Sequence, residues 1–200
     1  MDPESKPSLR ISHIVYGRKN DDGRVKYLLD QDGHEYFFPE DVVLMRWRRR
    51  KHPNASFSGA RLYPHLWRAL AEAMGTDCTN WPSQMNEETL HRARMAFRQA
   101  KDRQAYLKSL PELSTLEALW SFCGPQRLQK LVDRHRDRNV FGVPDLFLFA
   151  REHKTQKVYM GRFVEVKKPD EPISTGQREE IAFMNSLGLH ARLIRLIERD

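Results

Sequence analysis

Two apolar runs towards the C-terminal end dominate the hydrophobic pattern of the chain. Residues 142–149 and 161–168 are rich in aromatic and β-branched side chains, and the polar segment 151–157 separates them. This pattern predicts two neighbouring strands joined as a hairpin. Because side chains alternate along a strand, Glu165 and Lys167 are expected on one face and the valines beside them on the other.

Amphipathic segments flank this predicted hairpin. Apolar residues recur at helical spacing over residues 126–136, where Arg134 and other cations are expected to face outwards, and His135 is a weak candidate for proton relay. A second helix is expected over residues 174–186, with Ser174 as its N-cap and Gly188 after its end. Alternating residues then predict a closing strand up to residue 197.

The N-terminal half predicts a β-meander followed by helices. Short strands are expected at residues 11–15, 25–29 and 35–38, and a helix opens at Pro39. Ser56 or Ser58 is expected to cap the next helix, which runs to Met74. After a loop at residues 75–83, further helices are expected over residues 86–106 and from Ser114.

Acidic and basic residues converge on the predicted hairpin. If Asp145 opens the partner strand, its carboxylate, the Glu165 carboxylate and the carbonyl of Val166 can supply oxygen ligands for Mg²⁺ or Mn²⁺. Lys167 would then hold the nucleophile or a phosphate oxygen. The alternative is that Glu165 and Lys167 are exposed cross-strand charges and that Asp145 is a turn residue.

The order Gly142, Pro144-Asp145, Glu165-Val166-Lys167 and Gln177 resembles the virus-type replication-repair nuclease (VRR-NUC) family of PD-(D/E)xK nucleases. Residues 40–70 are also similar to the start of the nuclease domain in its cellular member, the Fanconi-anaemia-associated nuclease. The resemblance implies an α/β (α+β) restriction-endonuclease-like core and metal-dependent cleavage of DNA, often at flaps or junctions. It implies a tail and β-meander over residues 1–38 and a nuclease domain over 39–200, helical to 138 and catalytic from 139.

Gln177 has two candidate roles. Ser174 and Gln177 have the spacing of a capping box. The predicted inward face of the helix also lets Gln177 hold a metal-bound water or a phosphate in the site that the resemblance implies. The two roles are compatible.

The chain departs from the family at one acidic position. The family supplies a further glutamate from the helix that is predicted to follow Ser56 or Ser58, and the best register places Gly59 there. Glu40 and Glu72 are the alternative carboxylates. This departure leaves a second hypothesis open, a catalytically weakened protein that binds DNA or a protein partner.

Charge favours a polyanionic partner. Lys and Arg number 34 against 27 Asp and Glu, which gives a net charge of +7. A basic segment at the end of the first predicted helix, together with Lys168, is a candidate for contacts with the DNA backbone. Its cations are Arg46, Arg48, Arg49, Arg50 and Lys51. The alternative is a solvated helix end whose cations complement the dipole.

The cysteine content and the lengths of the apolar runs narrow the class of protein. Cys78 and Cys123 are far apart and fit neither a disulfide framework nor a zinc site. No run is long and apolar enough for a membrane helix, so we expect a cytoplasmic protein, with signal-less secretion as an effector left open. We expect a monomer, with a dimer or an inhibitor partner as alternatives. Repair, phage replication and a DNA-degrading toxin all fit as settings.

Overall fold

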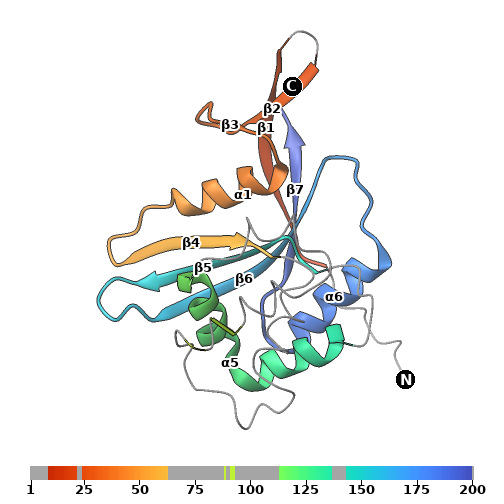
Figure 1. Cartoon of the computed structure of the whole chain (residues 1–200). Coiled ribbons are helices and arrows are strands. Elements are labelled where there is room, and N and C mark those ends of the chain that lie inside the picture. The colour runs from red at the N-terminus through yellow and green to blue at the C-terminus, as the bar shows by residue number, and fades with distance from the viewer. Residues whose placement is uncertain are drawn as a thin grey trace.

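A computed structural model describes residues 9–21, 24–62, 88, 91–92, 113–136 and 143–199 of the chain. Its described strands form one seven-stranded sheet with the order β3-β2-β1-β7-β6-β5-β4 (Figure 1). The elements are β1 (Ile11–Asp21), β2 (Arg24–Leu29), β3 (Glu35–Tyr36), α1 (Pro39–Arg48), β4 (Ala55–Arg61), α5 (Leu113–Arg136), β5 (Leu146–Glu152), β6 (Val158–Lys167), α6 (Thr175–Ser186) and β7 (Arg192–Glu198).

The predicted hairpin forms strands β5 and β6, which lie between β4 and β7 in the sheet. Strands β5 and β6 pair antiparallel, with Leu146 opposite Val164 and Phe147 opposite Phe163. Helix α6 then carries the chain over to β7, which pairs parallel to β6. The predicted order of helix, hairpin, helix and strand is confirmed.

Helices cover both faces of the sheet, with α1 on one face and α5 and α6 on the other (Figure 1). Val164 and Val166 pack in the core beneath α1, with Trp47 of that helix. Phe147 and Phe163 pack in the opposite core with residues of α5 and α6. Alternation along the strands therefore places successive side chains in two separate cores, as the sequence predicts.

Helix α5 bends at Gly124, whose φ of 69° is left-handed, and Pro125 follows it. The bend separates the two helices that the sequence predicts here. The expectation that Arg134 faces outwards is wrong, and His135, the candidate for proton relay, is buried. Arg134 Nε lies 2.7 Å and His135 Nε2 lies 2.9 Å from the carboxylate of Glu180, which is completely buried on α6. A buried acid needs such partners, so these two residues join α5 to α6.

The prediction that a helix starts at Ser56 or Ser58 is wrong for its first residues. Residues 55–61 form strand β4, which pairs antiparallel with β5 and places Gly59 opposite Leu148. Pairing with a strand far along the chain overrides the local helical spacing, which begins only at Leu62. The continuation of this helix to residue 74, the loop at 75–83, most of the helix at 86–106 and the tail at 1–8 lie outside the described residues.

The predicted meander is present, with β1 longer and β3 shorter than expected. Strand β1 pairs parallel to β7, with Ile11 opposite Leu193, so these strands extend the same sheet. None of the helices in the described ranges is both long and apolar enough to cross a membrane.

Candidate active site

The fold brings the predicted catalytic residues together at one end of the β5–β6 hairpin. Asp145 lies immediately before β5, Glu165 and Lys167 lie at the end of β6, and Gln177 lies in the first turn of α6. The Oδ2 atom of Asp145 accepts a hydrogen bond of 2.7 Å from the backbone N–H of Val166. This bond fixes the aspartate beside the strand that carries the other site residues. The Val166 carbonyl as a metal ligand stays a prediction.

Lys167 is buried between two carboxylates. Its Nζ atom lies 3.2 Å from Oε1 of Glu165 and 2.7 Å from Oε1 of Glu171. Glu165 and Lys167 are only 3% and 5% exposed, so they are not the exposed cross-strand charges of the alternative interpretation. Sequence reasoning missed Glu171, although its position four residues after Lys167 in a proline-bounded turn was the available signal.

Burial sets the protonation of this group. Burial raises the pKa of Asp145, and the negative charges of Glu40 and Glu171 raise it further, against the N–H of Val166 and the charge of Lys167. Burial, followed by the charge of Asp145, likewise raises the pKa of Glu165. The single positive charge of Lys167 therefore does not neutralise the negative charges of Asp145 and Glu165. Two hard oxygen donors with an excess of negative charge fit Mg²⁺ or Mn²⁺ well.

Lys167 itself remains a cation. Burial lowers the pKa of its ammonium group, but the hydrogen bond to Glu171 and the charge of Glu165 outweigh burial and raise it. The same bond keeps Glu171 ionised. Partial burial raises the pKa of Glu171, but the hydrogen bond from Lys167 outweighs burial and lowers it. Lys167 is therefore suited to binding a phosphate oxygen or orienting a nucleophile, and unsuited to accepting a proton.

Gln177 forms the capping box that the sequence predicts, and its role towards a metal-bound water or a phosphate stays a prediction. Its Oε1 accepts the backbone N–H of Ser174 at 3.0 Å, while its own N–H donates to Oγ of Ser174 at 3.2 Å. These bonds complete a capping box at the start of α6. The other end of the amide, Nε2, donates to Oε1 of Glu165.

Gly59 lies in strand β4 and not in the predicted helix, so that part of the interpretation is corrected, while its correspondence to the family glutamate stays a prediction. It is buried in β4, where an added Cβ would lie 2.6 Å from the carbonyl oxygen of Phe147. Besides Glu171, an acidic residue near the site is Glu40, in the first turn of α1, whose charge contributes to the raised pKa of Asp145. Glu72, the other alternative, lies outside the described residues.

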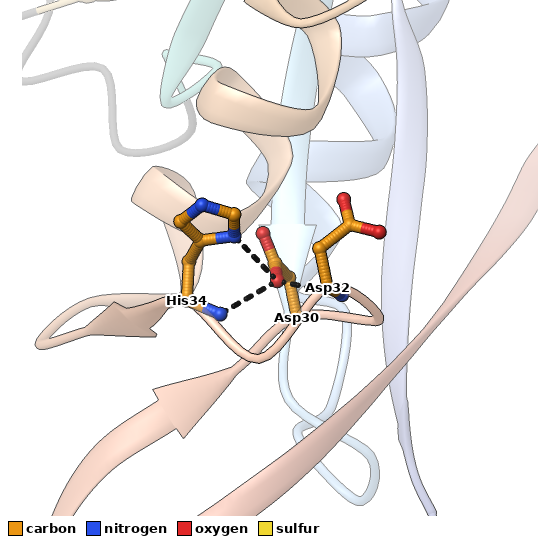
Figure 2. A group of neighbouring side chains, drawn as sticks. All are labelled: Asp30, Asp32 and His34. Carbon is orange, nitrogen blue, oxygen red and sulfur yellow. Dashed lines mark hydrogen bonds and ion pairs between the residues drawn. The ribbon is translucent and has the colours of Figure 1, made fainter.

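A second acidic group lies in the turn between β2 and β3, where Asp30, Asp32 and His34 have potential ligand atoms within 4.8 Å of one another (Figure 2). The carboxylate of Asp30 already accepts the N–H groups of Asp32 and His34 at 2.9 and 3.0 Å and the hydroxyl of Tyr36 at 2.9 Å. It also pairs with Arg49. These bonds explain the cluster as a structural turn that needs no metal.

The predicted DNA-binding cations occupy different environments. Arg48 donates to the carbonyl oxygen of Gly59 at 2.6 Å, and Arg49 binds Asp30 and Tyr36, so both have partners within the fold. Lys51 and Lys168 are exposed. Arg46 and Arg50 line a cavity on the α1 face of the sheet.

The order of elements and the buried Asp-Glu-Lys group define a nuclease fold of the PD-(D/E)xK class. The model of the VRR-NUC domain matches residues 85–195, and the chain therefore belongs to the VRR-NUC family. The match begins after β1, β2, β3, α1 and β4, and these four strands belong to the same sheet as the matched strands. None of the curated proteins compared with the chain matches it.

Two solved structures share the fold. They are crystal structures of paFAN1 bound to 5′-flap DNA with a gap, one with a 1-nucleotide and one with a 2-nucleotide flap. The first has a TM-score of 0.58 at 14% identity and the second 0.57 at 16%. Each match covers 100% of this chain, which spans 40% and 39% of the two paFAN1 chains.

Proposed function

We propose that the protein is a divalent-metal-dependent DNA nuclease that hydrolyses phosphodiester bonds in branched or flapped DNA. The observation that carries this proposal is the group of half-buried Asp145 with buried Glu165 and Lys167 at the end of the β5–β6 hairpin. Membership of the VRR-NUC family supports nuclease chemistry. The flap DNA in both paFAN1 structures supports the choice of substrate.

Asp145, Glu165 and Glu40 are the carboxylates that would hold the cation. Burial, and then the charge of Glu40, raise the pKa of Asp145, and burial, and then the charge of Asp145, raise the pKa of Glu165, so a bound cation would relieve the repulsion among these carboxylates. When bound, Mg²⁺ or Mn²⁺ lowers the pKa of a coordinated water and neutralises charge on the phosphate.

The protein's own side chains divide the remaining work. Lys167 carries a fixed positive charge beside Glu165 and can stabilise charge that develops on a phosphate oxygen. Glu171 holds that ammonium group from the other side at 2.7 Å. Gln177 fixes the rotamer of Glu165 through its amide, so the carboxylate does not have to reorganise during the reaction.

The alternative is a weakened nuclease that only binds DNA or a protein partner. Its support was the placement of Gly59 at the position of a family glutamate. Because Gly59 lies in β4 and Glu40 lies near Asp145, the structure gives no reason to prefer that alternative. The two proposals still differ in a measurable way. A nuclease loses cleavage under chelation, whereas a binding protein retains salt-sensitive DNA affinity.

The test is cleavage of linear, flapped, forked and four-way DNA in Mg²⁺, Mn²⁺ or a chelator. Asp145→Asn, Glu165→Gln and Lys167→Ala should each abolish cleavage and leave DNA affinity nearly intact, because the contacts to the DNA backbone remain. Glu179→Gln is the matched control, since it removes one exposed acid from α6. Cleavage by Asp145→Asn at the wild-type rate would refute the assignment.

A further inference from the structure

A cavity of about 160 Å³ lies on the α1 face of the sheet, apart from the carboxylate group. Its four arginines are Arg46 in α1, Arg50 just after α1, Arg162 on β6 and Arg192 on β7, and Ser12 and His13 of β1 complete the polar lining. No acidic residue is among its described lining residues. The cavity holds several water molecules by volume, at about 30 Å³ each, and so has room for a phosphate group.

An indole ring positions two of these arginines. The guanidinium groups of Arg50 and Arg162 lie 4.6 and 5.4 Å from the ring centroid of Trp47. The ring is itself fixed, because its Nε1 donates to the carbonyl oxygens of Ser58 and Phe149 at 2.9 and 3.0 Å. Contact with an aromatic face leaves the N–H donors of a guanidinium available to a ligand.

Three arginines elsewhere in the fold have acidic partners, and others, such as Arg127 and Arg195, donate to carbonyl oxygens. Arg61 lies 2.8 Å from Asp41, Arg134 lies 2.7 Å from Glu180, and Arg49 pairs with Asp30. Among the described residues, Arg46, Arg50, Arg162 and Arg192 have no such ion pair. The helix dipole accounts for cations at the end of α1, but Arg162 and Arg192 lie on strands and need another explanation.

The cations repel one another across the cavity. Burial lowers the pKa of Arg162, and the charges of Arg192 and Arg50 lower it further. Burial, then the charges of Arg10 and Arg50, lower the pKa of Arg192 in the same way. The Nε atom of Arg192 is also buried without a hydrogen-bond partner within the described structure. A bound anion would relieve the repulsion and accept this unused donor.

We propose that Arg46, Arg50, Arg162 and Arg192 form a pocket that binds a backbone phosphate of the DNA strand, separate from the scissile phosphate. Guanidinium groups match phosphate oxygens in pairs, and here half-buried Arg162 and Arg192 line the floor while exposed Arg46 and Arg50 line the solvent side. Arg162 lies three residues before Glu165 on β6, or about 10 Å along the strand. Because side chains alternate along β6, Arg162 projects to the α1 face and Glu165 to the opposite face, so the pocket would hold the DNA at a second point across the sheet from Glu165.

This inference rests on the proposed function for its choice of DNA, and the same phosphate chemistry is also present in free phosphate. The test compares the double variant Arg162→Gln/Arg192→Gln with Lys154→Gln/Lys157→Gln. The control removes the same charge from the exposed β5–β6 turn, at the far end of the hairpin from Asp145. DNA affinity is measured in a chelator over a series of salt concentrations.

The arginine variant should weaken DNA binding roughly tenfold and reduce the slope of log affinity against log salt by about one unit. The control should leave the slope within experimental error of the wild type. Both variants should melt no lower than the wild type, because removing Arg162 and Arg192 removes repulsion rather than an ion pair. A slope unchanged by the arginine variant would overturn the proposal.

Inorganic phosphate separates the two sources of the anion. If phosphate raises the melting temperature of the wild type only, and the DNA slope also falls in the arginine variant, the pocket binds DNA phosphate. A phosphate effect with an unchanged DNA slope would overturn the DNA assignment in favour of a small anion. Cleavage is scored independently: a chain that binds DNA through Arg162 and cleaves nothing would refute the nuclease proposal and leave the pocket in place.

Discussion

The amide of Gln177 connects the start of α6 to the carboxylate of Glu165. Its oxygen accepts the backbone N–H of Ser174, so its nitrogen must point towards the site and donate to Glu165. The capping box thus has a consequence beyond helix stability, because it fixes the orientation of the group that holds a catalytic carboxylate.

The two roles of Gln177 can be separated by Gln177→Glu. A glutamate retains the capping box, since this position accepts either residue, but it replaces the donor to Glu165 with a carboxylate. We expect normal folding and a cleavage rate that is lower by roughly tenfold or more. This factor corresponds to the free energy of one hydrogen bond to a charged group. Circular dichroism and the rate of cleavage measure the two effects.

Ser174→Ala is the matched control for Gln177→Glu. It removes the side-chain acceptor of the cap and leaves the amide of Gln177 in place. The expected loss is about 1 kcal/mol of unfolding free energy, with little effect on the rate. If Ser174→Ala slows cleavage as much as Gln177→Glu, the glutamine acts only by stabilising the helix.

Gly59→Glu should destabilise the protein and add no metal ligand. The first side-chain atom would lie 2.6 Å from the carbonyl of Phe147 and 2.9 Å from Cδ2 of Leu148. Even Gly59→Ala should lower the unfolding free energy by about 1–3 kcal/mol, as overpacked sites do. Gly17→Ala is the control, because a Cβ there would lie 3.6 Å from Leu29 in ordinary contact. A Gly59→Glu protein that is stable and more active in Mg²⁺ would restore the original register.

Local pattern predicted the hairpin that carries Asp145, Glu165 and Lys167, because strand alternation and turn composition act over a few residues. Helix α6 and its capping box were predicted for the same reason. The failure at Gly59 came from pairing between β4 and β5, which are distant in sequence. Glu40 and Glu171 could not be assigned either, since their positions relative to Asp145 depend on the packing of α1 and on the turn after β6.

Asp30 should make stability depend on pH. Burial opposes its ionisation, yet the hydrogen bonds from His34, Tyr36, Arg49 and Asp32 together lower its pKa to about 2. A lowered pKa stabilises the fold above the unfolded value of about 3.9, and this contribution is lost as the pH falls through about 2. Asp30→Asn should therefore reduce the unfolding free energy at pH 7 by about 2 kcal/mol and by progressively less in acid.

Chemical denaturation between pH 2 and pH 7 measures this difference. Asp32→Asn is the control, because its carboxylate is 73% exposed and lies 3.9 Å from Arg49. We expect a change below about 0.5 kcal/mol for this exposed pair. An equal effect of the two variants at pH 7 would contradict the structural role of the Asp30 carboxylate.

Glu40 provides the sharpest test of the corrected site. It lies beside Asp41 in the first turn of α1, and both acids face Arg61, at 3.8 Å for Glu40 and 2.8 Å for Asp41. Of these two acids, Glu40 is the one whose charge raises the pKa of Asp145. Two adjacent acids of the same helix turn and with the same cationic neighbour therefore differ in their relation to the metal ligands.

We expect Glu40→Gln to reduce cleavage by roughly tenfold to a hundredfold and to raise the Mg²⁺ concentration needed for half-maximal rate, because the site loses one negative charge. Asp41→Asn should leave both values near those of the wild type, since it weakens only a partly exposed ion pair to Arg61. Metal titrations of the cleavage rate compare the two variants directly. Loss of activity in Asp41→Asn with normal activity in Glu40→Gln would show that α1 contributes through Arg61, and that the third carboxylate lies elsewhere.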